Sequence, residues 1–201
     1  MGIIPTSLLH AVITPLHKGG SRTEPKQFRP VALTSHIIKV FERVVRKSLV
    51  NYLEENGLLW SGQHGFRALR STLTQLLSHF DAILADLEGG AKGTDSVYLD
   101  FSKAFDKVDH GVVLRAIHSL GIHGKLGIWL AAFLSNRTQE VVIDGTRSTK
   151  SSVTSGVPQG TVLGPVLFLV LINNIAAGVN QETHVASFAD DTRVSRAIHG
   201  H

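Results

Sequence analysis

The sequence predicts an α+β fold in which an antiparallel sheet is backed by helices. Helical periodicity dominates the first half of the chain, and short apolar segments separated by turn residues dominate the second half. One longer apolar segment lies between two expected hairpins and favours a buried helix. Hydrophobic residues make up 43% of the 201 residues and charged residues 18%, so the chain can form a core and is not intrinsically disordered.

Three amphipathic helices are expected before the first hairpin. Residues 36–55 carry apolar side chains at steps of three and four, and Gly57 provides a stop. Residues 72–87 repeat this pattern, and residues 111–120 follow Asp109, a favourable N-cap. The apolar side chains expected to face inward are Ile37, Ile38, Phe41, Val44, Val45, Leu49, Tyr52 and Leu53 in the first helix, and Leu73, Leu76, Leu77, Phe80, Ile83, Leu84 and Leu87 in the second.

The expected strands flank turn residues. Asp144-Gly145 favours a two-residue hairpin turn, and Asp190-Asp191 lies at the second expected hairpin. Residues 162–175, between the two hairpins, are expected to form the buried helix. The strands are expected at residues 96–101, as a short buried strand, and at 140–143, 147–153, 183–188 and 192–197.

Composition excludes several classes of function. The chain has no cysteine, which excludes a disulfide scaffold, a thiol nucleophile and thiolate zinc sites, and which is compatible with a nuclear or cytoplasmic location. The longest apolar run, residues 162–172, contains Gly164 and Pro165 and is too short to span a bilayer, so no membrane partner is expected. The net charge of +4 is compatible with a polyanionic partner.

The Asp190-Asp191 turn places two negative charges side by side. Adjacent like charges repel each other, and hairpin turns favour Asn-Gly or Asp-Gly instead. A bound cation would neutralise the pair, and oxygen ligands from separate strands suit Mg²⁺. Asp100, at the end of an expected strand, would complete a carboxylate cluster for two metal ions. The alternative is a solvated turn that binds no metal.

Five segments resemble the motifs of one family. Residues 99–106 (LDFSKAFD), 156–160 (GVPQG) and 188–191 (FADD) resemble three polymerase motifs of reverse transcriptases. Residues 28–35 (FRPVALTS) and 63–67 (QHGFR) resemble two upstream blocks of that family. Each motif alone is weak, but five in this order are highly specific, and the likeness runs from about residue 10 to residue 196, most of the chain. The resemblance is nearest to non-LTR (LINE-type) retrotransposons.

This resemblance implies a right-hand polymerase architecture and RNA-directed DNA polymerase activity in retrotransposition. Such an enzyme joins dNTPs to the 3′-hydroxyl of a DNA primer on an RNA template, so the RNA, the primer and dNTPs are the expected partners. The expected lobes are partial fingers at residues 1–93 and a truncated palm at residues 94–201. Because the sequence ends soon after Asp191, the thumb is expected to be missing.

The resemblance also implies roles for individual residues. Asp100, Asp190 and Asp191 would be catalytic and hold two Mg²⁺ ions, for which Mn²⁺ can substitute. Phe105 would lie under the nucleotide sugar and select deoxynucleotides, with ordinary core packing as the alternative. The other residues expected at the incoming nucleotide are Lys18, Arg29, Phe101, Gln159 and Gly160, and those expected at the template are Arg67 and Arg70.

Two other functions are weighed against the polymerase. Without a thumb, the chain would be a truncated retroelement remnant that is catalytically inert and at most binds RNA. A Mg²⁺-dependent nuclease using the same carboxylates would explain neither Phe105 nor Gln159, so it is disfavoured.

Overall fold

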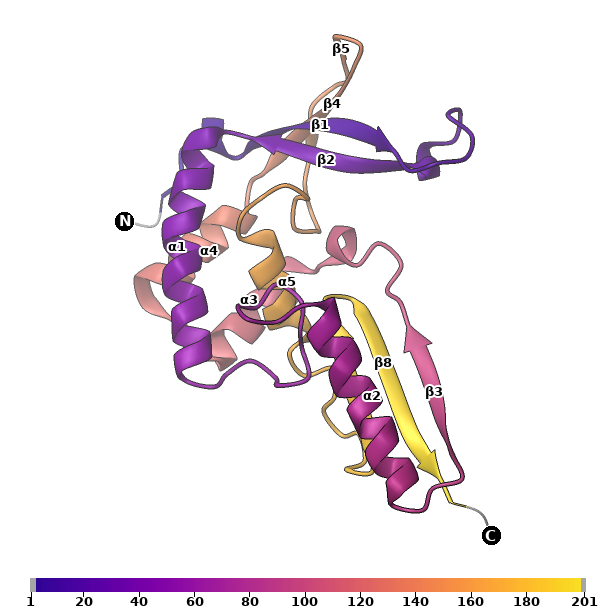
Figure 1. Ribbon diagram of the computed structural model, residues 1–201. Helices are drawn as coiled ribbons and strands as arrows, with labels where there is room; N and C mark the ends of the chain where they lie inside the picture. Colours follow the sequence, from indigo (N-terminus) through magenta and orange to yellow (C-terminus); the bar gives the residue numbers. More distant parts are fainter. Residues whose placement is uncertain (1–2, 200–201) are drawn as a thin grey trace. The chain divides into compact units, whose positions relative to one another are not determined.

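The computed structural model describes residues 3–199, which form two compact units (Figure 1). Unit 1 comprises residues 3–53 and Phe105–Phe168, and unit 2 comprises Glu54–Ala104 and residues 169–199. Each unit thus combines two stretches that are distant in the sequence, and none of the three boundaries, after residues 53, 104 and 168, falls after residue 93, where fingers and palm were expected to meet. The fingers and palm assignments remain predictions, because they name functional lobes rather than compact units.

Unit 1 contains a five-stranded mixed sheet. β1 runs antiparallel to β2, with Ala11 opposite Thr34, and parallel to β4, with His10 opposite Thr138. The first two strands and the parallel pairing were not predicted, because His, Pro and Thr interrupt the alternation that marks a strand. The strands are β1 (His10–His17), β2 (Phe28–Thr34), β4 (Thr138–Ile143), β5 (Thr146–Arg147) and β6 (Ser151–Ser152).

The hairpin expected at Asp144-Gly145 is confirmed, since Ile143 of β4 pairs with Thr146 of β5. The single strand expected at residues 147–153 is wrong. Two short strands replace it, and both pair antiparallel with β4, β5 near its end and β6 near its start. Because β5 and β6 pair with opposite ends of β4, the residues between β5 and β6 lie outside the regular strands.

The expected helices are confirmed with small shifts of their ends. Asp109 caps α3 as predicted, because its Oδ1 accepts a hydrogen bond from the Val112 N–H at 2.8 Å. A helix over Gly124–Leu134, α4, was not predicted. Among residues 3–199, no helix combines the length and the apolar character needed to cross a bilayer. The helices of unit 1 are α1 (His36–Glu55), α3 (His110–Ser119), α4 and the first part of α5 (Gly164–Ile172), with single 3₁₀ turns at Thr6–Leu8, Pro25–Gln27 and Phe105–Lys107.

Unit 2 contains an antiparallel sheet, as predicted, and its strand order is β3-β8-β7. Its strands are β3 (Gly93–Leu99), β7 (Thr183–Phe188) and β8 (Asp191–Ile198). The helix α2 (Thr72–Glu88) lies along this sheet (Figure 1). The description of residues 96–101 as a buried strand is wrong, because β3 is an edge strand and Tyr98 is 65% exposed.

The inward face of α2 also differs from the expected one. Gln75 and His79 are the buried residues of this helix, and the Gln75 amide donates to the Ala186 carbonyl of β7 at 3.3 Å. The periodicity of a sequence shows that a helix has an apolar face, but it does not show that other residues of the same chain pack against that face. The members of the stripe that are exposed are Leu73, Leu77, Phe80, Leu84 and Leu87.

In α1 the expected apolar face is only partly buried. Ile38, Leu49 and Leu53 are fully buried as predicted. The predicted inward residues that are instead exposed are Ile37, Phe41, Val44 and Tyr52.

The fourth buried residue of α1 is a carboxylate. Glu42 is fully buried, and its Oε2 accepts hydrogen bonds from the backbone N–H groups of Val162 at 2.6 Å and Leu163 at 2.9 Å. Burial raises the pKa of Glu42, while those N–H groups and the positive charge of Arg137 lower it. Arg137 is also buried, donates to the Phe133 carbonyl and lies 4.9 Å from the centre of the Phe133 ring. Unit 1 therefore holds a buried pair of opposite charges directly before α5.

Candidate functional site

The expected carboxylates lie at one end of the sheet in unit 2. Asp100 directly follows β3, and Asp191 begins β8. The register pairs Leu99 with Thr192, and this brings the end of β3 to the start of β8. Asp100 and Asp191 accordingly line one pocket of about 340 Å³.

Asp190 lies in the two-residue turn between β7 and β8, where Phe188 pairs with Asp191. Burial raises the pKa of Asp190, and the negative charges of Asp191 and Asp100 raise it further. A hydrogen bond to the backbone acts in the opposite direction. The three carboxylates therefore repel one another, and a cation bound among them would relieve this repulsion.

The donor set fits a hard divalent cation, because all three side chains offer carboxylate oxygens. Within the described part of the chain, no three acidic or histidine side chains stand close enough to form a ready-made metal site. The assignment of Asp100, Asp190 and Asp191 as metal ligands thus stays a prediction.

In unit 1, the loop at residues 155–160 is fastened to the segment that begins at Phe105. The Val157 N–H donates to the Phe105 carbonyl at 2.9 Å, and the Gly156 N–H donates to the Val108 carbonyl at 2.8 Å. Gly156 has a φ of +85°, and a Cβ there would lie 2.8 Å from the Asp106 carbonyl oxygen. Two of the five motif segments therefore meet through their backbones.

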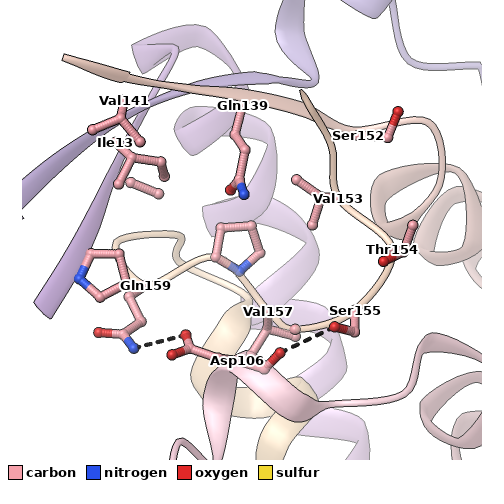
Figure 2. Close-up of a pocket in the computed structure, with 14 residues that line it drawn as sticks. Ile13, Asp106, Gln139, Val141, Ser152, Val153, Thr154, Ser155, Val157 and Gln159 are labelled. Carbon is pink, nitrogen blue, oxygen red and sulfur yellow. Dashed lines mark hydrogen bonds between the residues drawn. The ribbon is translucent and has the colours of Figure 1, made fainter. Parts of the chain in front are cut away.

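Asp106 contacts the same loop through its side chain, as Figure 2 shows. The Gln159 Nε2 donates to Asp106 Oδ1 at 3.1 Å, and the Ser155 hydroxyl donates to the Asp106 carbonyl at 3.3 Å. Asp106 and Gln159 line a pocket of about 360 Å³ that also includes residues of β1, β2 and β4. Sequence reasoning did not single out Asp106, although it closes the motif at residues 99–106.

Other residues expected at the nucleotide also have structural contacts in unit 1. The Phe105 ring stacks on Phe168, with centroids 4.5 Å apart and planes 23° apart. Gly160 has a φ of +113°, and a Cβ there would lie 2.6 Å from the Ala32 carbonyl oxygen. Close packing thus accounts for an aromatic residue and a glycine at these positions, and their roles at the nucleotide remain predictions.

The remaining nucleotide candidates are exposed. Lys18 follows β1, and its backbone N–H donates to the Gln27 carbonyl at the end of the β1–β2 hairpin where the connecting loop lies. Arg29 lies on β2 opposite Leu16. Phe101, in unit 2, is 46% exposed.

Arg67 has a structural role in unit 2. Its guanidinium donates two hydrogen bonds to the Glu54 carboxylate, one of 2.9 Å from Nε and one of 2.6 Å from Nη2. Its Nη1 donates to the Trp60 carbonyl. The hydrogen bond from Arg67 lowers the pKa of Glu54. Arg70 is half-buried and donates to the Ser61 carbonyl. The template contacts expected of both arginines remain predictions, and Arg67 is already engaged within the fold.

Comparison with known proteins agrees with the motifs. Residues 16–197 match the model of the family described as reverse transcriptase (RNA-dependent DNA polymerase). The chain is 33% identical to a probable RNA-directed DNA polymerase from transposon X-element of Drosophila melanogaster, over 92% of this chain and 20% of the relative. It is 29% identical to the RNA-directed DNA polymerase from mobile element jockey of the same species, over 96% of this chain and 22% of the relative.

Solved structures support the fold. Apo telomerase from Candida tropicalis, truncated from its C-terminal domain, matches with a TM-score of 0.70 and 13% identity, over 96% of this chain and 45% of that one. The expected α+β fold of the reverse transcriptase type is thereby confirmed. The chain spans about a fifth of the length of the two transposon relatives. It belongs to the reverse transcriptase family, as a domain of the kind that non-LTR retrotransposons carry.

Proposed function

We propose that the chain is the core of an RNA-directed DNA polymerase, which joins dNTPs to the 3′-hydroxyl of a DNA primer on an RNA template. The observation that supports the proposal is that the backbone brings Asp100, Asp190 and Asp191 to one end of the unit 2 sheet, where burial and then the negative charges of Asp191 and Asp100 raise the pKa of Asp190. Family membership and the names of the relatives support the same activity.

In this proposal the three carboxylates hold two Mg²⁺ ions, with Mn²⁺ as a substitute. Reverse transcriptases as a family use divalent metals. Bound ions of this kind lower the pKa of the attacking hydroxyl and neutralise charge on the transferred phosphate. The carboxylates supply fixed negative charge, and the paired strands hold Asp100 and Asp191 in place before substrate arrives.

The nucleotide would be bound by side chains of unit 1. Arg29 is exposed and can bind a phosphate with two parallel hydrogen bonds, and Lys18 adds a second positive charge. The Phe105 ring, held by Phe168, would exclude a ribose 2′-hydroxyl. Gln159 would contact the nucleotide with the part of its amide that Asp106 does not engage. In the same proposal Gly160 and Phe101 border the nucleotide.

Asp106 is expected to orient Gln159 for nucleotide binding. Asp106→Leu should raise the KM for dNTP about five- to tenfold, as the loss of one hydrogen bond predicts, with a smaller change in kcat. Asp106→Asn keeps an oxygen that accepts from Gln159 Nε2, so its KM should stay near that of the unsubstituted chain. Steady-state primer extension at varied dNTP concentration measures both constants. Equal KM values for Asp106→Leu and the unsubstituted chain would contradict the role.

Primer extension tests the proposed function. The purified chain is incubated with a DNA primer on an RNA template, dNTPs and Mg²⁺, and the products are sequenced. We expect slow, template-directed extension that stops when EDTA is added. Extension should persist in Asp144→Asn, which changes an aspartate in the other hairpin turn.

The alternative is a retroelement remnant that binds RNA without turnover. It predicts retention of the RNA in a binding assay, with no incorporated dNTP from a chain shown to be folded. That combination of results would refute the polymerase proposal for this chain.

A further inference from the structure

Gln63 is buried against the turn that carries Asp190. Its side chain belongs to unit 2, and the residue is 4% exposed. Its Oε1 accepts a hydrogen bond from the Ala189 N–H at 2.9 Å, and its Nε2 donates to the Ala189 carbonyl at 3.2 Å. One side-chain amide therefore satisfies both backbone groups of the residue directly before Asp190.

The amide of Gln63 is held in a single orientation. Its Oε1 also accepts from the Gly65 N–H at 2.7 Å, so the oxygen faces two donors and the nitrogen faces an acceptor. A flipped amide would place its NH₂ group against two N–H groups. Among the uncharged side chains of this length, only glutamine offers a donor and an acceptor together.

The backbone around Gln63 is fastened to the same hairpin. The His64 N–H donates to the Ser187 carbonyl at 2.7 Å, and the Ser187 N–H donates to the Gly62 carbonyl at 2.8 Å. Gln63 thus forms a parallel bridge with Ser187 at the end of β7. A Cβ on Gly65 would lie 2.3 Å from the Ala189 nitrogen, so this close approach requires glycine.

The clamped residue has a strained backbone. Ala189 has a φ of +55°, a left-handed conformation that costs a residue with a Cβ about 1–2 kcal/mol. Such a conformation persists only where its surroundings impose it. The two hydrogen bonds between the Gln63 amide and the Ala189 backbone help to hold Ala189 in this conformation.

We propose that Gln63 is a positioning residue for Asp190: by holding both backbone groups of Ala189, it keeps the strained turn in the conformation that presents the Asp190 carboxylate to a divalent metal. The inference rests on the proposed function, because it takes Asp190 to be a metal ligand. It gives the segment at residues 63–67 a role that sequence reasoning did not assign, since only Arg67 in that segment was considered.

Gln63→Met tests the proposal, because methionine keeps the length of the side chain and removes both hydrogen bonds. Asn173→Leu is the matched control, because leucine keeps the size of the side chain and removes both of its hydrogen bonds. The Asn173 amide, also in unit 2, accepts from the Trp60 N–H at 2.8 Å and donates to the Leu58 carbonyl at 2.7 Å, and it does not line the pocket of Asp100 and Asp191. Both variants should lower the free energy of unfolding by similar amounts.

Two measurements separate positioning from stability. Only Gln63→Met should weaken Mn²⁺ binding, by about tenfold for the loss of two hydrogen bonds, and only Gln63→Met should speed hydrogen exchange at the Ala189 N–H. Adding Ala189→Gly should recover part of the Mn²⁺ affinity, because glycine adopts a positive φ without strain.

The outcomes distinguish this proposal from the polymerase proposal. Unchanged Mn²⁺ affinity in Gln63→Met, or an equal loss in Asn173→Leu, overturns the positioning role whatever the primer-extension assay gives. If the expected Mn²⁺ and exchange results are obtained with a chain that makes no DNA, the positioning role is supported and the polymerase proposal fails.

Discussion

Asp190→Asn is expected to slow primer extension at least about 1,000-fold, since fixed charge at a developing phosphate contributes several kcal/mol and each 1.4 kcal/mol is a factor of ten. Asparagine keeps the size of the side chain and one oxygen, but it removes the negative charge. The repulsion that raises the pKa of Asp190 would disappear with it. Without metal, the free energy of unfolding should therefore stay equal or increase slightly.

Single-turnover extension and urea denaturation measure these two effects. The combination of a large loss of rate with no loss of stability distinguishes a catalytic carboxylate from a structural one. Asp144→Asn is the control, because Asp144 also lies in a hairpin turn, but that turn joins β4 and β5 of the unit 1 sheet, which does not contain β3. Extension by Asp190→Asn at more than about a tenth of the original rate would contradict the assignment.

Arg137→Met is expected to lower the free energy of unfolding by less than the roughly 3–5 kcal/mol found when one partner of a direct buried ion pair is removed, because Arg137 and Glu42 interact through their charges without a salt bridge between them. Glu42 would keep its two hydrogen bonds from Val162 and Leu163. Its charge would lose the stabilising field of Arg137 inside a core where burial already raises its pKa.

The double variant Glu42→Leu/Arg137→Met tests whether the two charges are coupled. Replacing both partners by apolar side chains removes the uncompensated charge, so the double variant should be more stable than the sum of the single effects predicts. The double variant should still be less stable than the unsubstituted chain, because the Val162 and Leu163 N–H groups lose their acceptor. If urea denaturation gives a change in the free energy of unfolding for the double variant that equals the sum of the changes for the single variants, the two charges do not stabilise each other.

Elements with strong local signals were predictable from the sequence. The helix α1 begins and ends where periodicity places it, and Asp109 caps α3 as its residue type suggests. The Asp144-Gly145 turn and the hairpin around Asp190 follow from turn residues between apolar segments. In each case the information lies within a few residues of the feature.

Features that depend on distant partners were not predictable. The parallel pairing of β1 with β4 joins residues about 128 positions apart, as the side-chain contact between His10 and Thr138 illustrates. The burial of Glu42 and Arg137 runs against the usual exposure of charged residues, and only the folded chain shows their shared environment. The sequence shows that α2 has an apolar face and predicted that this face is buried. The buried residues of α2 are instead Gln75 and His79.

The candidate site divides in the same way. The carboxylates Asp100, Asp190 and Asp191 could be proposed from the sequence because their motifs are specific and their chemistry is unusual at a turn. Gln63 and Asp106, the residues that we propose orient the site, have ordinary residue types, and their proposed roles depend on hydrogen bonds that span 126 and 53 positions.

The central claim is that Asp100 and Asp190 bind divalent metal together. Mn²⁺ titration followed by electron paramagnetic resonance tests it directly, with the chain bound to an RNA template, a dideoxy-terminated DNA primer and the next dNTP. We predict that two Mn²⁺ ions bind per chain, and that Asp100→Asn and Asp190→Asn each lose at least one. Full Mn²⁺ binding by either variant would contradict the account.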